Sequence, residues 1–394
     1  MIKFDFNTYI NKYIDINEYN SLLSKKNEIF KEFNSYDMIG WTNKIEQDLI
    51  NDIKKEALYI KNNFDALVVI GIGGSFLGSY AFSKMFSKYF NNSNFEIIYA
   101  GTSLSSQYMS DLLEYLEKKN FCLCVVSKSG TTLETTIAYK LLKDLLKRKY
   151  PSDIKNHIIT ITDKEKGSLR EETIKEGYKS FIIPNDIGGR YSFITPAHLL
   201  PLAINYDLDS IINGYYQGSE LIDDAYNYAV IRKLLFDKGK VVENYCVYEE
   251  NMSYFTEWLK QLFGESEGKN GKGVLPMSTV HTRDLHSLGQ FIQEGNKIIF
   301  ETFFKVLNSS SNILYDNKSL HEINNIVLDS VINAHYKGGV PCNLITIDEL
   351  SCENICKLIY FEELSAAFSS ILFGVNPFDQ PGVEVYKSEV RERM

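Results

Sequence analysis

The sequence predicts an α/β protein with two domains, each built on a parallel-rich sheet flanked by helices. Short runs rich in β-branched residues alternate with amphipathic helical stretches between residues 64 and 205, and a weaker series of the same kind follows between 206 and 376. Strands that alternate with helices at this spacing form right-handed βαβ units, which place parallel strands side by side. A chain of 394 residues is long enough for two such domains.

The expected strands and helices follow one another along the chain. The first domain has strand candidates LVVIGI (67–72), EIIYAG (96–101), CLCVVS (122–127), HIITIT (157–162) and SFIIP (180–184), with helices over 108–119 and 135–149. The second has VENYCVYEE (242–250), GVLPMS (273–278), KIIFETFFKVL (297–307) and CNLITID (342–348), with helices over 254–263 and 352–373. Residues 1–63 form a polar, helical N-terminal segment, and 377–394 predict a turn followed by a C-terminal helix.

Charge and composition exclude several classes of protein. The 51 acidic and 42 basic side chains give a net charge of −9, which argues against nucleic acid or an anionic membrane as the main partner. The six cysteines lack the spacing of a zinc site or a disulfide framework. The N-terminal MIKFDFNTYINKYID has no apolar signal-peptide core, so we expect a cytoplasmic protein. The uncharged stretch 66–83 is broken by glycines and serines, which favours strand, loop and helix over a membrane span.

The first loop of interest is VVIGIGGSFLG, residues 68–78. Gly71 and Gly73 fit the G-x-G-x-x-G pattern of a dinucleotide site, but Phe76 stands where the third glycine belongs. A bare backbone at a helix start still directs N–H groups at an anion, and Ser75 adds a hydroxyl donor beside Gly74. The loop therefore favours phosphate. A nicotinamide dehydrogenase is the weaker alternative, because EIIYAGTS lacks an acidic residue for the ribose.

A second loop, CVVSKSGTTLET, also runs from a strand into a helix. It gathers hydroxyls and one ammonium within six positions. In an open parallel sheet both loops lie beyond the carboxyl ends of their strands and face the same crevice. These groups suit a terminal phosphate monoester, although such residues also commonly cap a helix without binding anything. The candidate phosphate ligands are Ser127, Lys128, Ser129, Thr131 and Thr132.

Two further segments combine glycines with candidate residues. In DIGGRYS (186–192), Gly189 precedes Arg190, and the alternative to a ligand-binding role is a surface turn with a solvated arginine. In KQLFGESEGKNGKG, Gln261 ends a helix and Glu265 and Glu267 lie in a glycine-rich loop. A glutamate there is usually solvated, but in a closed site it becomes a usable base.

The other titratable candidates stand alone in the sequence. His286 lies in HTRDLHSLGQ near an expected helix start, and its spacing from His281 does not fit a metal motif. A packed or surface role is commoner for a lone histidine. In FDQPGVEVYK, Gln380 lies in a turn, and Lys387 lies on the following helix, where a lysine is usually solvated.

Taken together, the segments GIGGS, SKSGTTLET, GGRYS, GESEGK with DLHSLGQ, and DQPGVEVYK resemble the motifs of the glucose-6-phosphate isomerase family. They occur in one order, and the resemblance extends over the chain from about residue 40, including the GW before the first strand. The residues in these motifs are most similar to those of the compact bacterial branch of the family. The resemblance implies two sugar-isomerase (SIS-type) domains, a cytoplasmic homodimer without cofactor or metal, and interconversion of glucose 6-phosphate and fructose 6-phosphate in glycolysis and gluconeogenesis.

The resemblance also implies roles for the candidate residues. Gly74 and Ser75, with the hydroxyls and Lys128 of the second loop, would hold the 6-phosphate, and Gly189 and Arg190 would lie against C1 and C2. Gln261 and Gln380 would position hydroxyls. Glu265 would be the base, and the choice of Glu265 over Glu267 rests on the resemblance alone. His286, supplied across the dimer interface, would open the sugar ring with Lys387.

One residue departs from the family's motif, and one alternative class of protein was considered. His198 precedes LLPLA where the family more often has glycine, and we expect a difference in packing behind Arg190. A noncatalytic SIS-type sensor of sugar phosphates would keep both loops. It would not need Glu265, His286 and Lys387 together, and all three are present.

Overall fold

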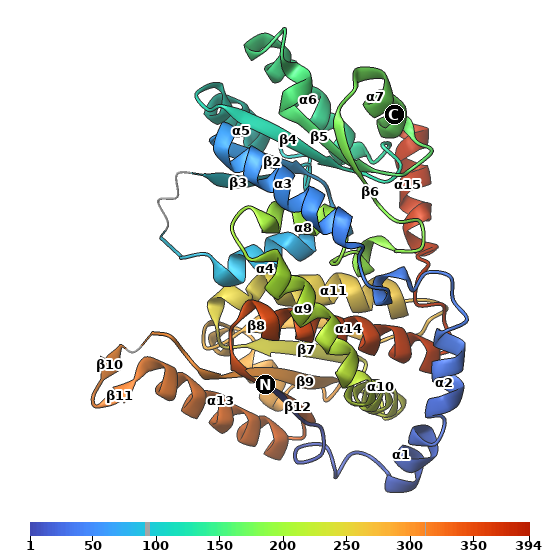
Figure 1. Cartoon of the computed structure of the whole chain (residues 1–394). Helices are drawn as coiled ribbons and strands as arrows, with labels where there is room; N and C mark the ends of the chain where they lie inside the picture. The colour runs from blue at the N-terminus through green and yellow to red at the C-terminus, as the bar shows by residue number, and fades with distance from the viewer. Residues whose placement is uncertain (91–94, 312) are drawn as a thin grey trace. The chain divides into compact units, whose positions relative to one another are not determined.

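The computed structural model describes residues 1–90, 95–311 and 313–394 (Figure 1). The chain forms two compact units. One consists of residues 37–209, and the other of residues 1–36 together with 210–394. Each unit contains one five-stranded sheet.

The sheet of residues 37–209 has the strand order β3-β2-β4-β5-β6, and all of its pairings are parallel. The two central strands, β2 and β4, are buried along their whole length. Since alternate residues of a strand face opposite sides, helices must cover both faces of the sheet. The strands are β2 (Ala66–Ile70), β3 (Glu96–Ala100), β4 (Phe121–Val126), β5 (Ile158–Thr162) and β6 (Lys179–Ile182).

Two groups of helices pack in this unit. Apolar residues of α5 and α6 form one core with β2, β4 and β5, while α8 contacts both α3 and α4. The helices are α3 (Gln47–Asn63), α4 (Leu77–Phe86), α5 (Ser106–Glu117), α6 (Leu133–Lys149), α7 (Ser168–Glu176) and α8 (Pro196–Ala203). The helix α9 (Leu208–Gln217) crosses the boundary to the other unit.

The second sheet has the order β1-β12-β9-β7-β8 and is parallel except for β1, which pairs antiparallel with β12. A short hairpin, β10 with β11, stands apart from it in the sheet topology. The strands are β1 (Ile2–Asp5), β7 (Val242–Val247), β8 (Leu275–Val280), β9 (Ile299–Asn308), β10 (Leu314–Tyr315), β11 (Lys318–Ser319) and β12 (Cys342–Glu349).

A long buried helix, α14, is central to this unit. Nearly every residue from Ile355 to Ile371 is buried, and α14 contacts α10 and α11. A helix that is apolar on all sides needs such a position. The helices are α1 (Ile16–Leu23), α2 (Lys26–Phe33), α10 (Ile222–Asp237), α11 (Ser253–Glu267), α12 (Gly289–Glu294), α13 (Leu320–Lys337), α14 (Cys352–Leu372) and α15 (Gly382–Arg393). Of the helices described, none combines the length and the apolar character that crossing a membrane requires.

The structure confirms the predicted fold class, and each predicted strand is present to within a few residues. The N-terminal segment differs from a purely helical one, because residues 2–5 form the edge strand β1. The helices α1 and α2 belong to the unit of the second sheet, whereas α3 belongs to the unit of the first, and α15 belongs to the second. The domain boundaries at 64, 206 and 377 stay predictions.

The end of α11 corrects another expectation. The sequence places Glu265 and Glu267 in a loop after a helix that ends at Gln261, but the helix continues to Glu267. Glycine at 264 weakens a helix without forbidding it. The last turn closes through a hydrogen bond of 3.0 Å from the Gly268 N–H to the Gly264 carbonyl, and the Glu267 side chain is anchored in the core.

Candidate functional site

The two predicted phosphate loops lie at the same edge of the first sheet. β2 and β4 are parallel neighbours, with Ile70 opposite Val125. The short 3₁₀ helix η2 (Gly73–Ser75) follows β2, and residues 127–132 follow β4. The structure therefore brings the loops together as the strand order requires, at the position where open α/β sheets bind ligands.

The GGRYS segment packs directly on the first loop. It forms a second 3₁₀ helix, η4 (Gly189–Tyr191), which contacts η2. A β-carbon added at Gly74 would lie 2.1 Å from the carbonyl oxygen of Gly189 and 2.8 Å from the amide nitrogen of Arg190. The contact between the loops is thus backbone on backbone, and only glycine fits at Gly74.

Arg190 is buried in this arrangement, with 3% of its surface exposed. The alternative of a solvated arginine on a surface turn is therefore wrong. The neighbouring Tyr191 stacks on Trp41, with ring centroids 5.5 Å apart, so the GW motif supports the segment that carries Arg190. A buried guanidinium is a fixed cation, because its side chain cannot move into water.

The second loop is shaped by its own hydroxyls. The Ser127 hydroxyl accepts a hydrogen bond of 3.0 Å from the Gly130 N–H, and the Ser129 hydroxyl accepts one of 3.2 Å from the Thr131 N–H. Thr132 occupies the N-cap position of α6, but its side chain makes no capping hydrogen bond to that helix. Capping by Thr132 therefore does not explain this group of hydroxyls.

Lys128 is held over the neighbouring segment after β6. Its Nζ donates to the carbonyl oxygens of Pro184 and Asn185 at 3.3 and 3.4 Å. Burial lowers the pKa of Lys128, in opposition to the carboxylates of Asp163 and Asp186. This lysine is a partly buried ammonium that a phosphate would stabilise, because a dianion supplies the charge that the carbonyls lack.

In the other unit, two glutamates of α11 have different environments. Glu267 is fully buried, where it accepts hydrogen bonds from the Arg232 guanidinium and, at 3.3 Å, from the Val274 N–H. Burial raises the pKa of Glu267, and the contact with Arg232 acts in the opposite direction. Glu265 is half-buried one turn after Gln261, whose Nε2 lies 3.3 Å from its Oε1. Among the residues that the structure describes, Oε1 of Gln261 is buried without a hydrogen-bond partner.

A lysine that the sequence analysis did not single out joins two candidate segments. The Nζ of Lys269 donates to the carbonyls of Ser266, at 3.0 Å, and Asn376, and pairs with Asp379 at 2.8 Å. The end of α11 and the segment before Gln380 are therefore tied together. In the sequence, the position of Lys269 next to ESEG is the feature that could have pointed to this role. A lysine among glycines is, however, expected to be solvated when its hydrogen-bond acceptors are not known.

The remaining candidates lie on the surface of the single chain. His286 ends the 3₁₀ helix η7 (Arg283–His286) and is exposed. Lys387 lies on α15 as predicted, and its Nζ pairs with Glu384 at 2.8 Å. These contacts agree with the ordinary role of a helix-surface lysine, so the role of Lys387 rests on its motif.

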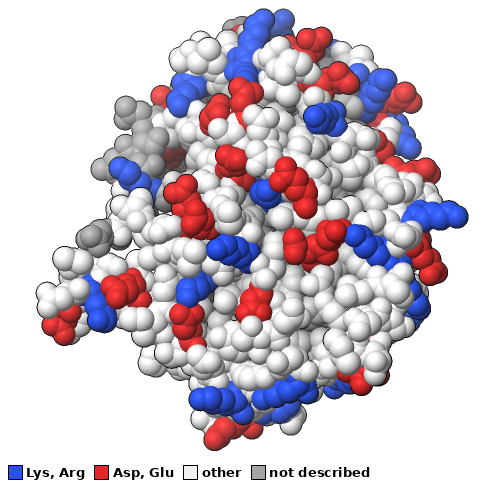
Figure 2. All heavy atoms as spheres, turned by 60° about the horizontal axis from the view of Figure 1, so that its bottom comes forward, with Lys and Arg blue, Asp and Glu red and all other residues white. Residues whose placement is uncertain are grey.

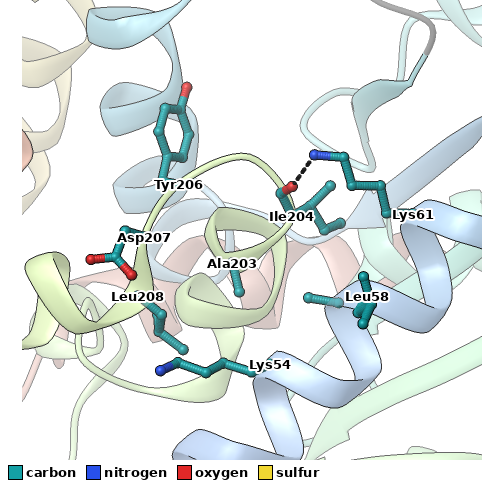
Figure 3. Close-up of a pocket in the computed structure, with 9 residues that line it drawn as sticks. Lys54, Leu58, Lys61, Ala203, Ile204, Tyr206, Asp207 and Leu208 are labelled. Atoms are coloured by element: carbon teal, nitrogen blue, oxygen red, sulfur yellow. Dashed lines mark hydrogen bonds between the residues drawn. The ribbon is translucent and has the colours of Figure 1, made fainter.

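A pocket in residues 37–209 contains none of the candidate residues. It has a volume of about 380 Å³ and lies between α3 and the connection from α8 to α9 (Figure 3). Lys61 on its wall donates to the Ile204 carbonyl at 2.8 Å, and Lys54 pairs with Asp209 at 2.6 Å. On the face of the molecule shown in Figure 2, basic and acidic side chains lie interspersed.

The fold is that of the SIS-type phosphosugar isomerases. A tagatose-6-phosphate ketose/aldose isomerase from Escherichia coli has a similar structure, with a TM-score of 0.52 and 11% identity over 94% of this chain and 95% of that one. A glucose-6-phosphate isomerase from Chlamydia trachomatis is more similar, with a TM-score of 0.83 and 20% identity over 98% of this chain and 90% of that one.

Sequence comparison narrows the class to one family. The family model described as phosphoglucose isomerase matches residues 44–326. A glucose-6-phosphate isomerase from Staphylococcus haemolyticus is 42% identical over 381 residues, which cover 90% of this chain and 86% of the relative. A glucose-6-phosphate isomerase from Acetivibrio thermocellus is also 42% identical, over 386 residues and the same shares. The chain belongs to the phosphoglucose isomerase family.

Proposed function

We propose that this protein catalyses the reversible isomerisation of glucose 6-phosphate to fructose 6-phosphate, a step of glycolysis and gluconeogenesis. Family membership supports the reaction. One structural observation carries the site: the Arg190 segment is packed backbone on backbone against the glycine loop. An anion-binding loop and a fixed cation are thereby held together, as the substrate and its intermediate require.

In this proposal the first unit holds the phosphate. The helix start after η2 and the hydroxyls after β4 supply hydrogen-bond donors, and Lys128 supplies the charge. The remote phosphate contributes binding energy that orients the reacting carbons, so it affects rate as well as affinity. The residues assigned to this subsite are Gly74, Ser75, Ser127, Lys128, Ser129, Thr131 and Thr132.

Glu265 is the proposed base. Moving the carbonyl between C1 and C2 requires one proton to leave one carbon and return to the other, so one carboxylate suffices. Glu267 is the other carboxylate of the motif, and its oxygens are engaged by Arg232 and the Val274 N–H. This supports Glu265 as the glutamate that meets substrate. Arg190 lies against C1 and C2 beside Gly189, where it stabilises the enediolate as its charge develops.

The remaining residues prepare the sugar. The substrate arrives as a closed ring, so protons must first move between the ring oxygen and the anomeric hydroxyl, a task assigned to His286 and Lys387. Gln261 and Gln380 position hydroxyls, and the buried acceptor of Gln261 supports its part. The carbon oxidised and the carbon reduced belong to the same molecule, so the reaction itself consumes no redox partner.

The active form in this proposal is a cytoplasmic homodimer in which His286 acts on the site of the partner. The exposure of His286 in the single chain supports this, since a group that serves a second copy must reach the surface. The hairpin β10–β11 also exposes apolar side chains, including Leu314 and Tyr315, which are 64% and 70% exposed. Such groups commonly lie at protein interfaces.

A coupled assay for glucose 6-phosphate formed from fructose 6-phosphate tests the reaction. Glu265→Gln is expected to lower kcat by about 10²–10⁴-fold while substrate still binds, because only the proton shuttle is lost. Glu257→Gln, on the same helix and paired with Lys260 at its surface, is the matched control and should keep full activity. Near-normal turnover of Glu265→Gln would rule out this residue as the base.

Mixing two inactive variants tests the exchange of His286 between subunits. A heterodimer of Glu265→Gln and His286→Ala would carry both defects in one site and neither in the other, so mixing and re-equilibration should restore activity. The double variant mixed with itself is the control. If the variants exchange subunits but regain no activity, His286 acts within its own chain.

A further inference from the structure

His198 is a buried histidine behind the glycine loop. It lies on α8 with 2% of its surface exposed, and its two ring nitrogens contact two different parts of the first α/β unit. Nδ1 lies 3.0 Å from the amide nitrogen of Ser79, and Nε2 lies 2.7 Å from the carbonyl oxygen of Gly74.

The partners determine the state of the ring. A backbone N–H can only donate, so Nδ1 accepts from Ser79 and bears no proton. The ring proton is then on Nε2, which donates to the Gly74 carbonyl. Burial lowers the pKa of His198 to about 4, so the neutral ring persists at physiological pH.

The Gly74 carbonyl is held from one more side. The Ser192 hydroxyl lies 2.9 Å from it and 2.6 Å from the Gly189 carbonyl, and shares its single proton between them. A carbonyl oxygen carries partial negative charge and would repel a bound phosphate. By drawing this oxygen toward α8, the imidazole fixes the orientation of the peptide that joins Gly74 to Ser75.

The second contact serves the helix that follows the loop. Phe76 is the N-cap residue of α4 and gives no side-chain cap, so the first N–H groups of α4 need other partners. His198 accepts one of them, from Ser79. Gly78 lets the ring approach, because a β-carbon there would lie 3.2 Å from Cε1 of His198.

We propose that His198 is a positioning residue that sets the phosphate-binding conformation of residues 73–75. The inference rests on the assignment of this loop to the substrate phosphate. His198 does not touch the substrate. It acts through the Gly74 carbonyl, so its main effect is on the affinity for the phosphate group, and it affects the chemistry at C1 and C2 only through the orientation that the bound phosphate provides.

Three substitutions separate the two contacts of the ring. His198→Gln can place an amide donor near the position of Nε2, His198→Asn can place an acceptor near the position of Nδ1, and His198→Phe keeps the bulk without either bond. Each variant is assayed for KM, kcat, the inhibition constant of inorganic phosphate, and thermal stability. Inorganic phosphate is the probe because it reports on the phosphate subsite alone.

In the His198→Asn and His198→Phe variants we expect KM and the inhibition constant of phosphate to rise together by about tenfold, as loss of one buried hydrogen bond implies, with a smaller fall in kcat. In the His198→Gln variant, KM and the inhibition constant of phosphate should both stay within about twofold of the wild-type values, because glutamine retains the hydrogen-bond donor. A lower melting temperature with unchanged phosphate affinity would reduce His198 to a packing residue and overturn the proposal. Equal losses in Gln and Asn would overturn it as well.

Ser75→Ala and Lys128→Ala separate this inference from its premise. If neither changes the inhibition constant of phosphate, the loop does not hold the phosphate, and the proposed function of the site fails first. If both weaken phosphate binding while His198→Asn does not, the loop assignment stands and only the role of His198 falls.

Discussion

The two α/β units hold their candidate site residues by different means. In residues 37–209 the loops are held by backbone: Gly74 touches Gly189 without intervening side chains, and hydroxyls bond to main-chain groups. In residues 210–394 charged side chains hold the candidate segments: Arg232 and Glu267 form a buried pair, and Lys269 pairs with Asp379, whose side chain is exposed. The close contact between Gly74 and Gly189 requires that Gly74 have no side chain, whereas the charged pairs of the other unit require that both partners be present.

The largest effect is expected where a buried charge loses its partner. Arg232→Ala would leave Glu243, which accepts from Nε of Arg232 at 2.7 Å, and Glu267 in the core without a cation. We expect a loss of about 3–5 kcal/mol in the free energy of unfolding, measured by chemical denaturation. Lys233→Ala, which removes a partly exposed pair with Asp237 and a contact of the ammonium with the Phe373 ring, should cost about 1 kcal/mol. Equal losses would mean that the buried network is not what stabilises this unit.

A smaller but distinct effect is expected in the backbone-built unit. Gly74→Ala forces a β-carbon to within 2.1 Å of the Gly189 carbonyl, so the two loops must separate. We expect a loss of about 3 kcal/mol in stability, as overpacking typically produces, together with weaker substrate binding. Gly188→Ala is the matched control, because its φ of −78° suits alanine and its β-carbon would meet only Met38, at 3.8 Å. Similar behaviour of the two variants would show that the close backbone contact is not required.

Acid should weaken both units by the same mechanism. Each contains a buried histidine, His198 in one and His281 in the other, and burial lowers the pKa of each from 6.5 to about 4. Between these values the unfolded chain binds protons that the folded chain refuses, so stability falls as pH drops from about 6.5 to about 4. At pH 5 each histidine accounts for about 2 kcal/mol of this loss.

Substitution identifies these groups in a pH titration of stability. His281→Gln should remove the part of the stability loss between pH 7 and pH 5 that His281 causes. His198→Gln should remove the part that His198 causes. Any change in the free energy of unfolding at pH 7 is a separate effect of each substitution. The quantity to measure is the slope of the free energy of unfolding against pH. A slope unchanged in both variants would show that neither histidine is kept neutral by folding.

The sequence was sufficient to predict the α/β fold class, its strands and the position of the two phosphate loops at one edge of a sheet. The apolar run CLCVVS (122–127) was predicted as a buried strand, and parallel strands end at a common edge, so the two phosphate loops were expected to face one crevice; the structure adds that β2 and β4 are direct neighbours. The sequence also placed Lys387 on the helix that carries it, whereas the 3₁₀ helix that carries Arg190 was not predicted.

The contacts that hold the site could not be predicted, because they join residues far apart in the chain. His198 reaches Gly74 across 124 positions, and Lys269 reaches Asn376 across 107. The end of α11 was misplaced for the same reason: its last turn is anchored by Arg232, which local propensity does not reveal. Short periodic patterns report neighbours on one element, whereas these bonds depend on how separate elements meet.

The mildest test concerns Lys128, the ammonium of the loop after β4. Lys128→Ala removes an ammonium that donates to the carbonyls of Pro184 and Asn185 at 3.3 and 3.4 Å and interacts electrostatically with Asp163 and Asp186. Because neutral carbonyls compensate a buried cation poorly, stability should change little, while KM for fructose 6-phosphate should rise about tenfold. Lys166→Ala, at an exposed lysine nearby, is the control for a general loss of positive charge. An unchanged KM for Lys128→Ala, or an equal rise in both, would remove Lys128 from the phosphate subsite and leave that loop with hydroxyl and backbone donors alone.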